Sequence, residues 1–378
     1  MSGIYVHFPF CKRKCIYCNF YSVSREDLKS QYLEALSHEI ELRADDLRGD
    51  TVETLYFGGG TPSLCAIDEL AAVIKKLRST FIFAPKLEFT VEANPEQLTT
   101  DYLRGLRKIG VNRLSIGVQS FDDEILTLLG RTHNATTAKT ALENAFAAGF
   151  NNVSIDLIYG IAARQPDQWR QELKEAFSHP ITHLSAYSLT VEENTLLHRK
   201  ISNGALPPPN EDCAVDDYWT LVEEAGKQSF EQYEISNFAR DGKISRHNSA
   251  YWAHTPYLGL GAAAHSFNGT ERSWNAADVN RYIQGCATGA PPRESETLTM
   301  RELFNEYILL RLRTSAGIRL NDLQQRFGAE RRKKTENYLT KLPTGFYISD
   351  GEHIALTAEG RLHADNIAME LFETEEEN

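Results

Sequence analysis

The stretch GIYVHFPFCKRKCIYCNFYS, residues 3–22, decides both the fold and the chemistry that this sequence predicts. A short apolar run at its start predicts a β-strand, and the loop that follows carries Cys11, Cys15 and Cys18 in a C-x3-C-x2-C spacing. Three thiolates on one short loop can converge on a single metal centre. Because a four-iron cluster normally takes four cysteine thiolates, three ligands leave one iron with the open coordination position that a reactive metal site needs.

Two other interpretations of this loop stay open at this point. One is a zinc site with His7 as the fourth ligand, and the other is a reduced thiol cluster without metal. Neither is favoured, because the sequence has no second cysteine pair and no C-x2-C…H-x3-H pattern. The remaining cysteines, Cys65, Cys213 and Cys286, lie far apart without metal-ligand spacing, so we interpret them as core or surface thiols.

The composition is that of a globular protein with ample material for a core. Of the 378 residues, 42% are hydrophobic and 24% are charged, and the length suggests two to three domains. No apolar run approaches the roughly 18 residues that span a bilayer, and six cysteines with three in one cluster argue for a reducing compartment. A formal net charge of −12 argues against nonspecific nucleic-acid binding. We therefore expect a cytosolic protein with at most peripheral membrane contact.

Six segments have the pattern of β-strands and alternate with amphipathic helical segments. These are the run before the cysteines and residues 51–57, 87–91, 113–118, 153–158 and 183–189. Such alternation predicts a parallel sheet with right-handed crossovers, whereas a closed eight-stranded barrel would need two further βα units. The chain instead continues into an irregular connection that contains Pro207, Pro208 and Pro209. We predict an α/β fold, an open partial (β/α)6 barrel over residues 1–230.

Polar residues follow several of these strands at the point where each strand ends. The glycine-rich segment GGGTP, residues 58–62, follows the second strand, Glu92 ends the third, Gln119 ends the fourth, and Asp156 lies late in the fifth. In parallel α/β folds the residues that perform chemistry gather at the C-terminal ends of the strands. The glycines permit close backbone approach to a polar ligand, although a tight strand-to-helix turn would also explain them. The sequence thus predicts one polar site beside the cysteine loop.

The C-x3-C-x2-C spacing within HFPFCKRKCIYCNF resembles the radical S-adenosylmethionine (SAM) superfamily. Within it the string resembles the branch that contains the anaerobic coproporphyrinogen oxidases and the HemW family of heme chaperones. The resemblance covers nearly the whole chain. It implies a [4Fe–4S] cluster on Cys11, Cys15 and Cys18, with SAM bound at the open iron.

The same resemblance implies a set of SAM-binding residues, matched one by one through GGGTP, VEANP, IGVQS, LGRTHN and IDLIYG. These residues are Tyr5, Gly59, Gly60, Thr61, Glu92, Gln119, Arg131 and Asp156. A carboxylate can receive ribose hydroxyls or an amino group, and Arg131 can pair with the SAM carboxylate. Outside this context, Arg131 would be a surface charge at a helix end and Asp156 a strand residue with a local partner.

Residues 231–295 are predicted to link the barrel to a last domain. They contain His247, Asn248, Tyr251 and Trp252, which match the H-N-x-x-Y-W signature of the HemW family. A neutral imidazole is a natural axial ligand of heme iron, and aromatic neighbours can pack on a porphyrin, so His247 is the expected heme ligand. The alternative is a hydrogen-bonded loop histidine beside core aromatics. His265, in GAAAHSF, is a second candidate.

Residues 296–378 are predicted to form a small C-terminal domain. Three helical stretches precede a hairpin with Asp350 and Gly351 in its turn, which resembles a winged-helix domain. Its basic residues, Arg326 and the run 331–334, favour a solvated helix face over a DNA-binding surface. We expect no nucleic-acid partner, and the family resemblance favours a structural or partner-docking role.

Two features separate a heme carrier from an oxidase within this branch. The oxidases carry a further cysteine two residues after the third cluster cysteine, where this chain has Phe20, and a longer segment ahead of the first strand, which here is reached by Ile4. We therefore expect a chaperone that binds heme and delivers it to acceptor hemoproteins of the respiratory chain, with a low-potential electron donor for the cluster. The alternative is an oxygen-independent coproporphyrinogen-III oxidase-type decarboxylase. Reductive SAM cleavage is compatible with both.

The variant Cys15→Ala is expected to abolish the iron–sulfur absorbance of the reconstituted protein, because the cluster would keep only two of its protein ligands. The protein should still fold, since the substitution lies on a loop. Iron content and visible absorption after anaerobic reconstitution measure the effect, with Cys213→Ala as the control outside the motif. Unchanged iron and absorbance in Cys15→Ala would place the metal elsewhere.

Overall fold

Six parallel strands form the centre of the structure. The computed structural model describes residues 2–165 and 167–374, and within them these strands lie side by side in chain order. They are β1 (Ser2–Phe8), β2 (Thr51–Gly59), β3 (Ile82–Ala93), β4 (Arg113–Gln119), β5 (Val153–Tyr159) and β6 (His183–Ser188). The expected open, six-stranded parallel arrangement is confirmed, because the described strands do not close into a barrel.

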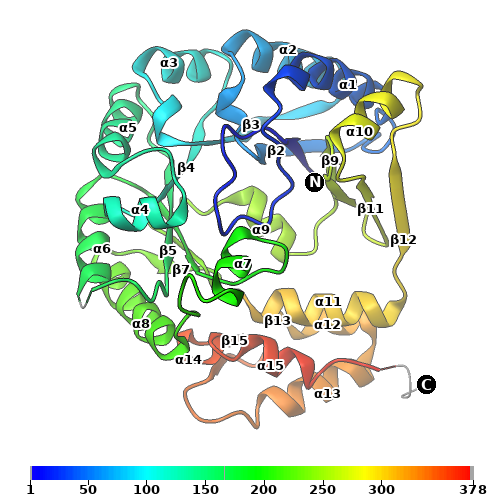
Figure 1. Cartoon of the computed structure of the whole chain (residues 1–378). Helices are drawn as coiled ribbons and strands as arrows, with labels where there is room; N and C mark the ends of the chain where they lie inside the picture. Colours follow the sequence, from blue (N-terminus) through cyan, green and yellow to red (C-terminus); the bar gives the residue numbers. More distant parts are fainter. Residues whose placement is uncertain (1, 166, 375–378) are drawn as a thin grey trace.

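Helices cover the outer face of these strands, and Figure 1 shows them around the outside of an open crescent. This layer includes η1 (Glu26–Leu28), α1 (Lys29–Leu42), α2 (Ile67–Thr80), α3 (Thr100–Lys108), α5 (Ala135–Ala147), α6 (Gln168–Ser178) and α8 (Glu211–Lys227). The short elements η2 (Pro62–Leu64), η3 (Pro95–Gln97) and α4 (Asp123–Leu129) follow the ends of β2, β3 and β4. Side chains alternate along β1, so Ile4, Val6 and Phe8 enter the core under the helices, while Tyr5 and His7 face inward.

The sheet is longer than the six predicted strands, because residues 231–295 add strands at both of its edges. Beyond β6 lie β8 (Asn237–Ala239), which is antiparallel to β6, and β7 (Glu231–Gln232), which is antiparallel to β8. Beyond β1 lie β9 (Tyr257–Leu260), which is parallel to β1, then β10 (His265–Phe267), β11 (Glu271–Asn275) and β12 (Arg293–Thr297), which are antiparallel. The result is a mixed, twelve-stranded sheet among the described residues.

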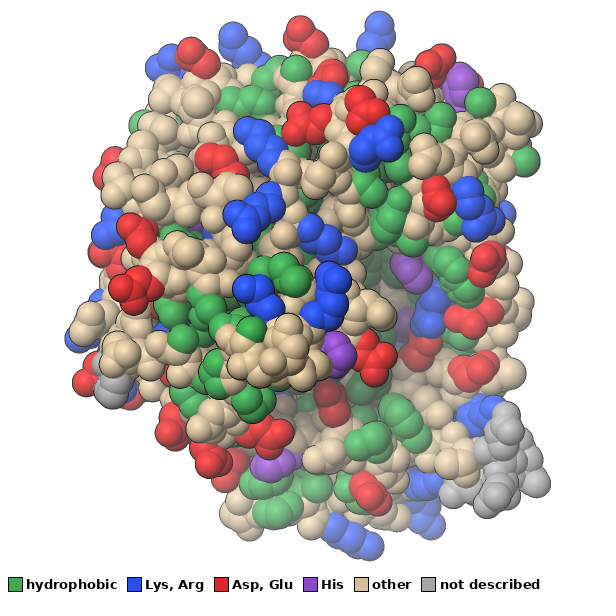
Figure 2. Space-filling model, viewed as in Figure 1, with side chains coloured by type: hydrophobic (Ala, Val, Ile, Leu, Met, Phe, Trp, Pro, Cys, Tyr) green, Lys and Arg blue, Asp and Glu red, His purple; other side chains and the backbone are tan. Residues whose placement is uncertain are grey.

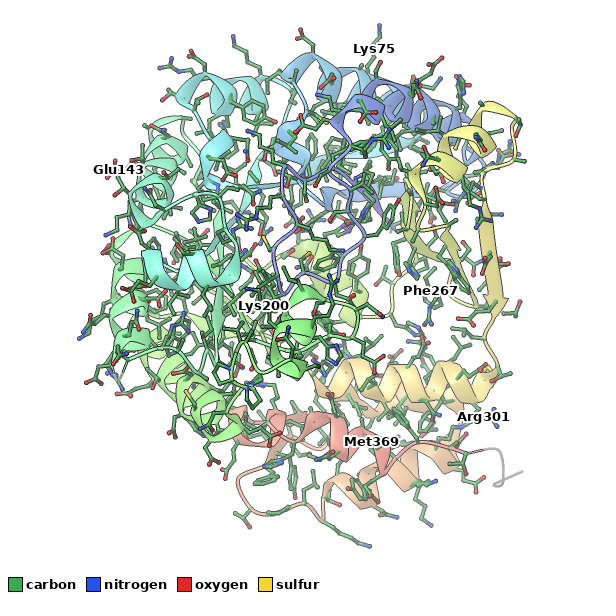
Figure 3. The ribbon with its side chains drawn as sticks, viewed as in Figure 1. Lys75, Glu143, Lys200, Phe267, Arg301 and Met369 are labelled. Carbon is green, nitrogen blue, oxygen red and sulfur yellow. The ribbon has the colours of Figure 1, made fainter. Side chains whose placement is uncertain are left out.

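Three further helices lie beside this central sheet. They are α7 (Leu196–Ser202), α9 (Arg246–Trp252) and α10 (Val279–Ala287). The backbone N–H of Leu197 in α7 donates to the carbonyl of Ile16 at 2.8 Å, so α7 packs against the cysteine loop. Figure 3 shows α7, marked by Lys200, next to this loop at the centre of the molecule.

The C-terminal domain has its own apolar core. It contains α11 (Met300–Leu312), β13 (Ile318–Arg319), α12 (Leu320–Phe327), α13 (Ala329–Leu339), β14 (Tyr347–Ser349), β15 (His353–Leu356), α14 (Ala358–Arg361) and α15 (Ala364–Met369). Its three strands pair in the order β13-β15-β14, which with the preceding helices gives the expected winged-helix-like arrangement. Thr299 starts α11 with a capping box, in which Glu302 accepts a bond from the Thr299 N–H at 2.7 Å.

Hydrogen bonds join this domain to the sheet. The Tyr218 hydroxyl in α8 donates to the carbonyl of Ala358 at 2.9 Å, and Arg361 Nη2 donates to Gln232 Oε1 at 2.8 Å. Phe267 of β10 belongs to the core of the C-terminal domain. None of the described helices has both the length and the apolar character that crossing a bilayer requires.

The backbones of β9 and β10 approach each other closely at Gly259, at this edge of the sheet. The variant Gly259→Ala tests this close approach. A Cβ at position 259 would lie 1.9 Å from the carbonyl oxygen of His265, a backbone atom that cannot move aside. The substitution should lower the free energy of unfolding by about 3 kcal/mol or more, as overpacking does at its upper end. Denaturant unfolding followed by circular dichroism measures the effect.

Gly226 in α8 provides the matched control, because a Cβ there would meet nothing within 4 Å. Gly226→Ala should leave stability unchanged or raise it by up to about 1 kcal/mol, since alanine favours a helix. Equal stability of the two variants would contradict the tight β9–β10 approach.

Candidate cluster and cofactor site

A cavity of about 760 Å³ lies at the C-terminal ends of the central strands. Its wall includes the cysteine loop and residues in or just after the C-terminal ends of β2, β3, β4, β5 and β6. This volume is in the range of small-molecule and cofactor sites. Parallel strands end at the same edge of the sheet, which explains why residues so far apart in the chain meet here.

Backbone hydrogen bonds hold the cysteine loop in place at both of its ends. The N–H of Cys11 donates to the carbonyl of Val23 at 3.1 Å, and the N–H of Val23 donates to the carbonyl of Pro9 at 2.7 Å. The N–H of Ile16 donates to the carbonyl of Leu129 at 3.2 Å. The thiols between these anchors stay partly exposed and line the cavity.

Polar groups surround two of the thiols. Cys11 Sγ lies 3.5 Å from Thr61 Oγ1, and Arg131 Nη1 donates to Cys15 Sγ at 3.4 Å. Hydrogen bonds to sulfur are one of the means by which a protein tunes an iron–sulfur cluster. Burial raises the pKa of the Cys11 and Cys18 thiols, so a metal centre, which binds thiolates, would displace protons from them. The donor set therefore fits a cluster held by three cysteines.

The zinc alternative receives no support from the arrangement of His7. The imidazole is 4% exposed, with its Nδ1 at 3.1 Å from the Tyr5 hydroxyl and its Nε2 at 2.9 Å from the carbonyl of Tyr21. One zinc ion would require sulfurs within about 4 Å of one another, because each Zn–S bond is about 2.3 Å. No group of three or more His, Cys, Asp or Glu side chains in the described part of the chain is arranged around a single ion.

The glycine-rich segment crosses the end of β1 too closely for side chains. A Cβ on Gly59, whose φ is +105°, would lie 2.5 Å from the His7 ring, and a Cβ on Gly60 would lie 2.7 Å from the carbonyl oxygens of Phe8 and Phe10. Glycine is therefore required at both positions. The close crossing brings the backbone of this segment against the cysteine loop and into the cavity wall.

Two half-buried carboxylates face the cavity. Glu92 accepts hydrogen bonds from the N–H of Gly59 at 3.0 Å and from the Tyr56 hydroxyl at 2.8 Å, and Asp156 accepts one from Ser115 Oγ at 3.2 Å. Burial raises the pKa of Glu92 to about 7 and that of Asp156 to about 6. A cationic or hydroxyl-bearing ligand would favour their ionised forms, so both carboxylates suit the ammonium or ribose of SAM.

Arg131 is held in place by its own hydrogen bonds. Its Nη2 donates to Asn94 Oδ1 and to the carbonyl of Gly117, both at 2.7 Å. Its buried Nε has no hydrogen-bond partner among the described residues. Gln119 adopts a φ of +68° at a register shift between β4 and β5, which places it at the cavity wall.

The predicted SAM residues thus gather at one site, with one exception. All of them except Tyr5 line the cavity with the three cysteines. The Tyr5 ring lies inside the crescent, 6.4 Å from the ring of His247, and its hydroxyl contacts His7. Contact with SAM stays a prediction for each of these residues.

One wall of the cavity was not anticipated from the sequence. Ile235 and Ser236 reach it from the loop after β7, and Arg313 reaches it from the end of α11 in the C-terminal domain. Arg313 forms an ion pair with Asp365, and its guanidinium lies 5.7 Å from the centre of the Trp252 ring. No local pattern around Arg313 signals this position, because it depends on how the last domain docks.

His247 is buried beneath the cavity, at 2% exposure. Its Nδ1 lies 2.8 Å from Thr54 Oγ1 and its Nε2 lies 2.7 Å from the Tyr251 hydroxyl, one helical turn further along α9. Burial, and then the charge of Arg113, lower the pKa of His247 to about 3, so the ring is neutral. Ligation of heme iron by His247 would require one of these two hydrogen bonds to break.

Comparison with known proteins agrees with this architecture. Residues 5–176 match the model of the Radical SAM superfamily, and residues 298–363 match that of the HemN C-terminal domain. Proteins named heme chaperone HemW are similar over their full length. The protein from Mycobacterium tuberculosis is 35% identical, and the match covers 98% of this chain and 94% of the relative. The protein from Bacillus subtilis is 32% identical, and the match covers 97% of this chain and 98% of the relative. The chain belongs to the HemW family of radical SAM proteins.

Two other relatives extend the comparison. The mouse mitochondrial radical S-adenosyl methionine domain-containing protein 1 is 34% identical to this HemW-family chain over 98% of it and 87% of the relative. The solved structure of the radical SAM enzyme coproporphyrinogen III oxidase (HemN) from Escherichia coli superposes with a TM-score of 0.84 at 27% identity, covering 98% and 89% of the two chains. Superfamily membership implies a [4Fe–4S] cluster and SAM as cofactors of this HemW-family protein.

The raised pKa of Glu92 generates a pH-dependent prediction for Glu92→Gln. The carboxyl has a pKa near 7 in the folded protein against an ordinary 4.5, so its ionisation costs stability above about pH 4.5, and the cost is complete above pH 7. In the SAM-free protein, Glu92→Gln should raise the free energy of unfolding near pH 8 by at most about 3 kcal/mol, with the gain shrinking toward pH 5. Denaturant unfolding at both pH values measures it.

Glu143→Gln is the control, because Glu143 is exposed on α5, as Figure 3 shows, and should give no pH-dependent difference. Glu92→Gln should also weaken SAM binding, because it removes a charge that faces the ligand. A stability difference that stays constant from pH 5 to pH 8 would contradict the raised pKa.

Proposed function

We propose that this protein binds heme and delivers it to acceptor hemoproteins in the cytosol, including those of the respiratory chain. It does so while it holds a [4Fe–4S] cluster on Cys11, Cys15 and Cys18 with SAM at the open iron. The observation that carries the proposal is the similarity to proteins named heme chaperone HemW over 97–98% of this chain. The cavity of about 760 Å³ beside the three thiols provides room for the cofactor.

The residues of the cavity have separate tasks in this proposal. A bound cluster supplies an electron at low potential and an open iron position for the amino and carboxylate groups of SAM. Arg131 pairs with the carboxylate of SAM, and Glu92 and Asp156 receive the polar hydrogens of SAM. The backbone of the segment from Gly59 to Thr61 closes the same side of the cavity.

The surface around the thiols is suited to an acidic electron donor. Lys12, Arg13 and Lys14 are exposed on the cysteine loop and line the mouth of the cavity. Figure 2 shows Lys and Arg side chains gathered near the centre of this face, although the whole chain has a formal net charge of −12. Local charge of one sign steers the encounter with a partner of the opposite sign. A low-potential donor with an acidic surface fits this position.

The similarity to coproporphyrinogen III oxidase favours one alternative, a radical SAM decarboxylase that acts on coproporphyrinogen. Phe20 argues against it. The oxidases carry a further cysteine at this position, whereas the ring of Phe20 is 68% exposed and lines the cavity. A phenyl ring supplies no thiol for chemistry and no hydrogen bond to a carboxylate.

Heme titration of the cluster-loaded protein tests the proposal. Difference spectra against the same protein without heme should show a saturable Soret band, and an apo-hemoprotein added afterwards should acquire the heme. Bovine serum albumin, loaded with heme in the same way, controls for nonspecific release. Absence of saturable heme binding would overturn the proposal.

Anaerobic incubation with coproporphyrinogen, SAM and a reductant distinguishes the decarboxylase from the heme chaperone. We expect no decarboxylated product, because the cavity lacks the additional cysteine. Product formation at the rate of an oxidase control would replace the chaperone with the decarboxylase.

A further inference from the structure

The strands added beyond β1 carry a group of aromatic and charged side chains on one face. In the strand register, His265 is paired with Trp274, and Phe267 is paired with both Arg272 and Tyr257. Residues paired in this way point to the same side of a sheet. Tyr257 is in turn paired with Gly3 of β1. The face therefore continues the inner surface of the crescent on which Tyr5 and His7 lie.

His265 is exposed on this face and stacks on Trp274, with ring centres 5.9 Å apart and an angle of 28° between the planes. Among the described residues, its ring nitrogens make no hydrogen bond. Partial burial, and then the charge of Arg272, lower the pKa of His265, so the imidazole is neutral near pH 7 and keeps a free lone pair.

Other histidines near the interior differ in this respect. The ring nitrogens of His7, His183, His247 and His254 all have partners within hydrogen-bond distance. Each of these four rings is also buried, at 8% exposure or less. An iron ion could reach none of them without the loss of a hydrogen bond.

Figure 2 shows a hollow between the strands beyond β1 and the C-terminal domain, with histidine side chains inside it. Figure 3 places Phe267, two residues further along β10, beside the same hollow and above α11. His265 shares this face of β10 with Phe267, so its side chain borders the hollow.

We propose that His265 ligates the iron of heme bound in this hollow, with Trp274 holding the plane of the imidazole. The inference rests on the proposed function, since it assumes that the protein binds heme. A neutral imidazole with a free nitrogen is a protein ligand that heme iron takes, and the stacked ring of Trp274 holds this imidazole in one plane.

The H-N-x-x-Y-W signature then supports the site instead of ligating the iron. Its His247 bonds to Tyr251, and the ring of Tyr251 packs edge-on against Tyr257 with centres 4.5 Å apart. Tyr257 belongs to the same face as His265. The signature helix α9 therefore holds the floor of the hollow, which gives its aromatic residues a role in heme binding without contact to iron.

The test is a heme titration of cluster-loaded wild type and of His265→Ala, followed by difference absorption and by electron paramagnetic resonance of the ferric state. His265→Ala should lose the low-spin signal of an imidazole ligand and bind heme at least about tenfold more weakly. Added imidazole should restore the signal. His353→Ala, in the C-terminal hairpin, is the matched control and should behave as wild type.

A second variant covers the case in which His265→Ala fails to fold, as judged by circular dichroism and iron content. His265→Met keeps a large side chain and supplies a thioether, so the low-spin spectrum should shift to that of a methionine ligand. Wild-type spectra and affinity in both variants would overturn the inference while leaving heme binding intact. Wild type that binds no heme would instead overturn the proposed function, and this inference with it.

Discussion

Parallel alignment of β1 to β6 is the constraint on which the rest of the structure depends. Because the strands run in one direction, the loop that follows each of them arrives at the same edge of the sheet. The cysteines, the glycine-rich segment, Glu92, Gln119 and Asp156 come from five different strands, yet they share one cavity. Loss of this alignment would separate groups that lie far apart in the sequence.

The buried histidines His183 and His247 inside the crescent carry no positive charge near neutral pH. Arg113 is 1% exposed near the start of β4, and its Nε and Nη1 have no hydrogen-bond partner among the described residues. After the larger effect of burial, its charge lowers the pKa of both His183 and His247. These rings therefore remain neutral hydrogen-bonding groups that position the strands and α9. The carboxylates of Glu92 and Asp156 face the cofactor cavity instead.

The sequence predicted the parts of the fold that depend on local pattern. Apolar runs marked the six central strands, and their polar ends marked the cavity wall, since both follow from the chain alone. The edge strands β7 to β12 were missed, because segments of two to five residues acquire strand geometry only from their partners. The alternative of a hydrogen-bonded His247 beside core aromatics was considered, but its partner Thr54 could not be predicted, because Thr54 lies 193 residues away in the sequence.

The contribution of Arg313 to the cavity has a consequence for biosynthesis. The thiols lie near the start of the chain, whereas Arg313 and its partner Asp365 are translated close to the end. A ribosome exposes the cysteine loop long before the last wall of the cavity exists. Until the final domain has been made and has docked, the cavity beside the three thiols lacks the part of its wall that Arg313 provides.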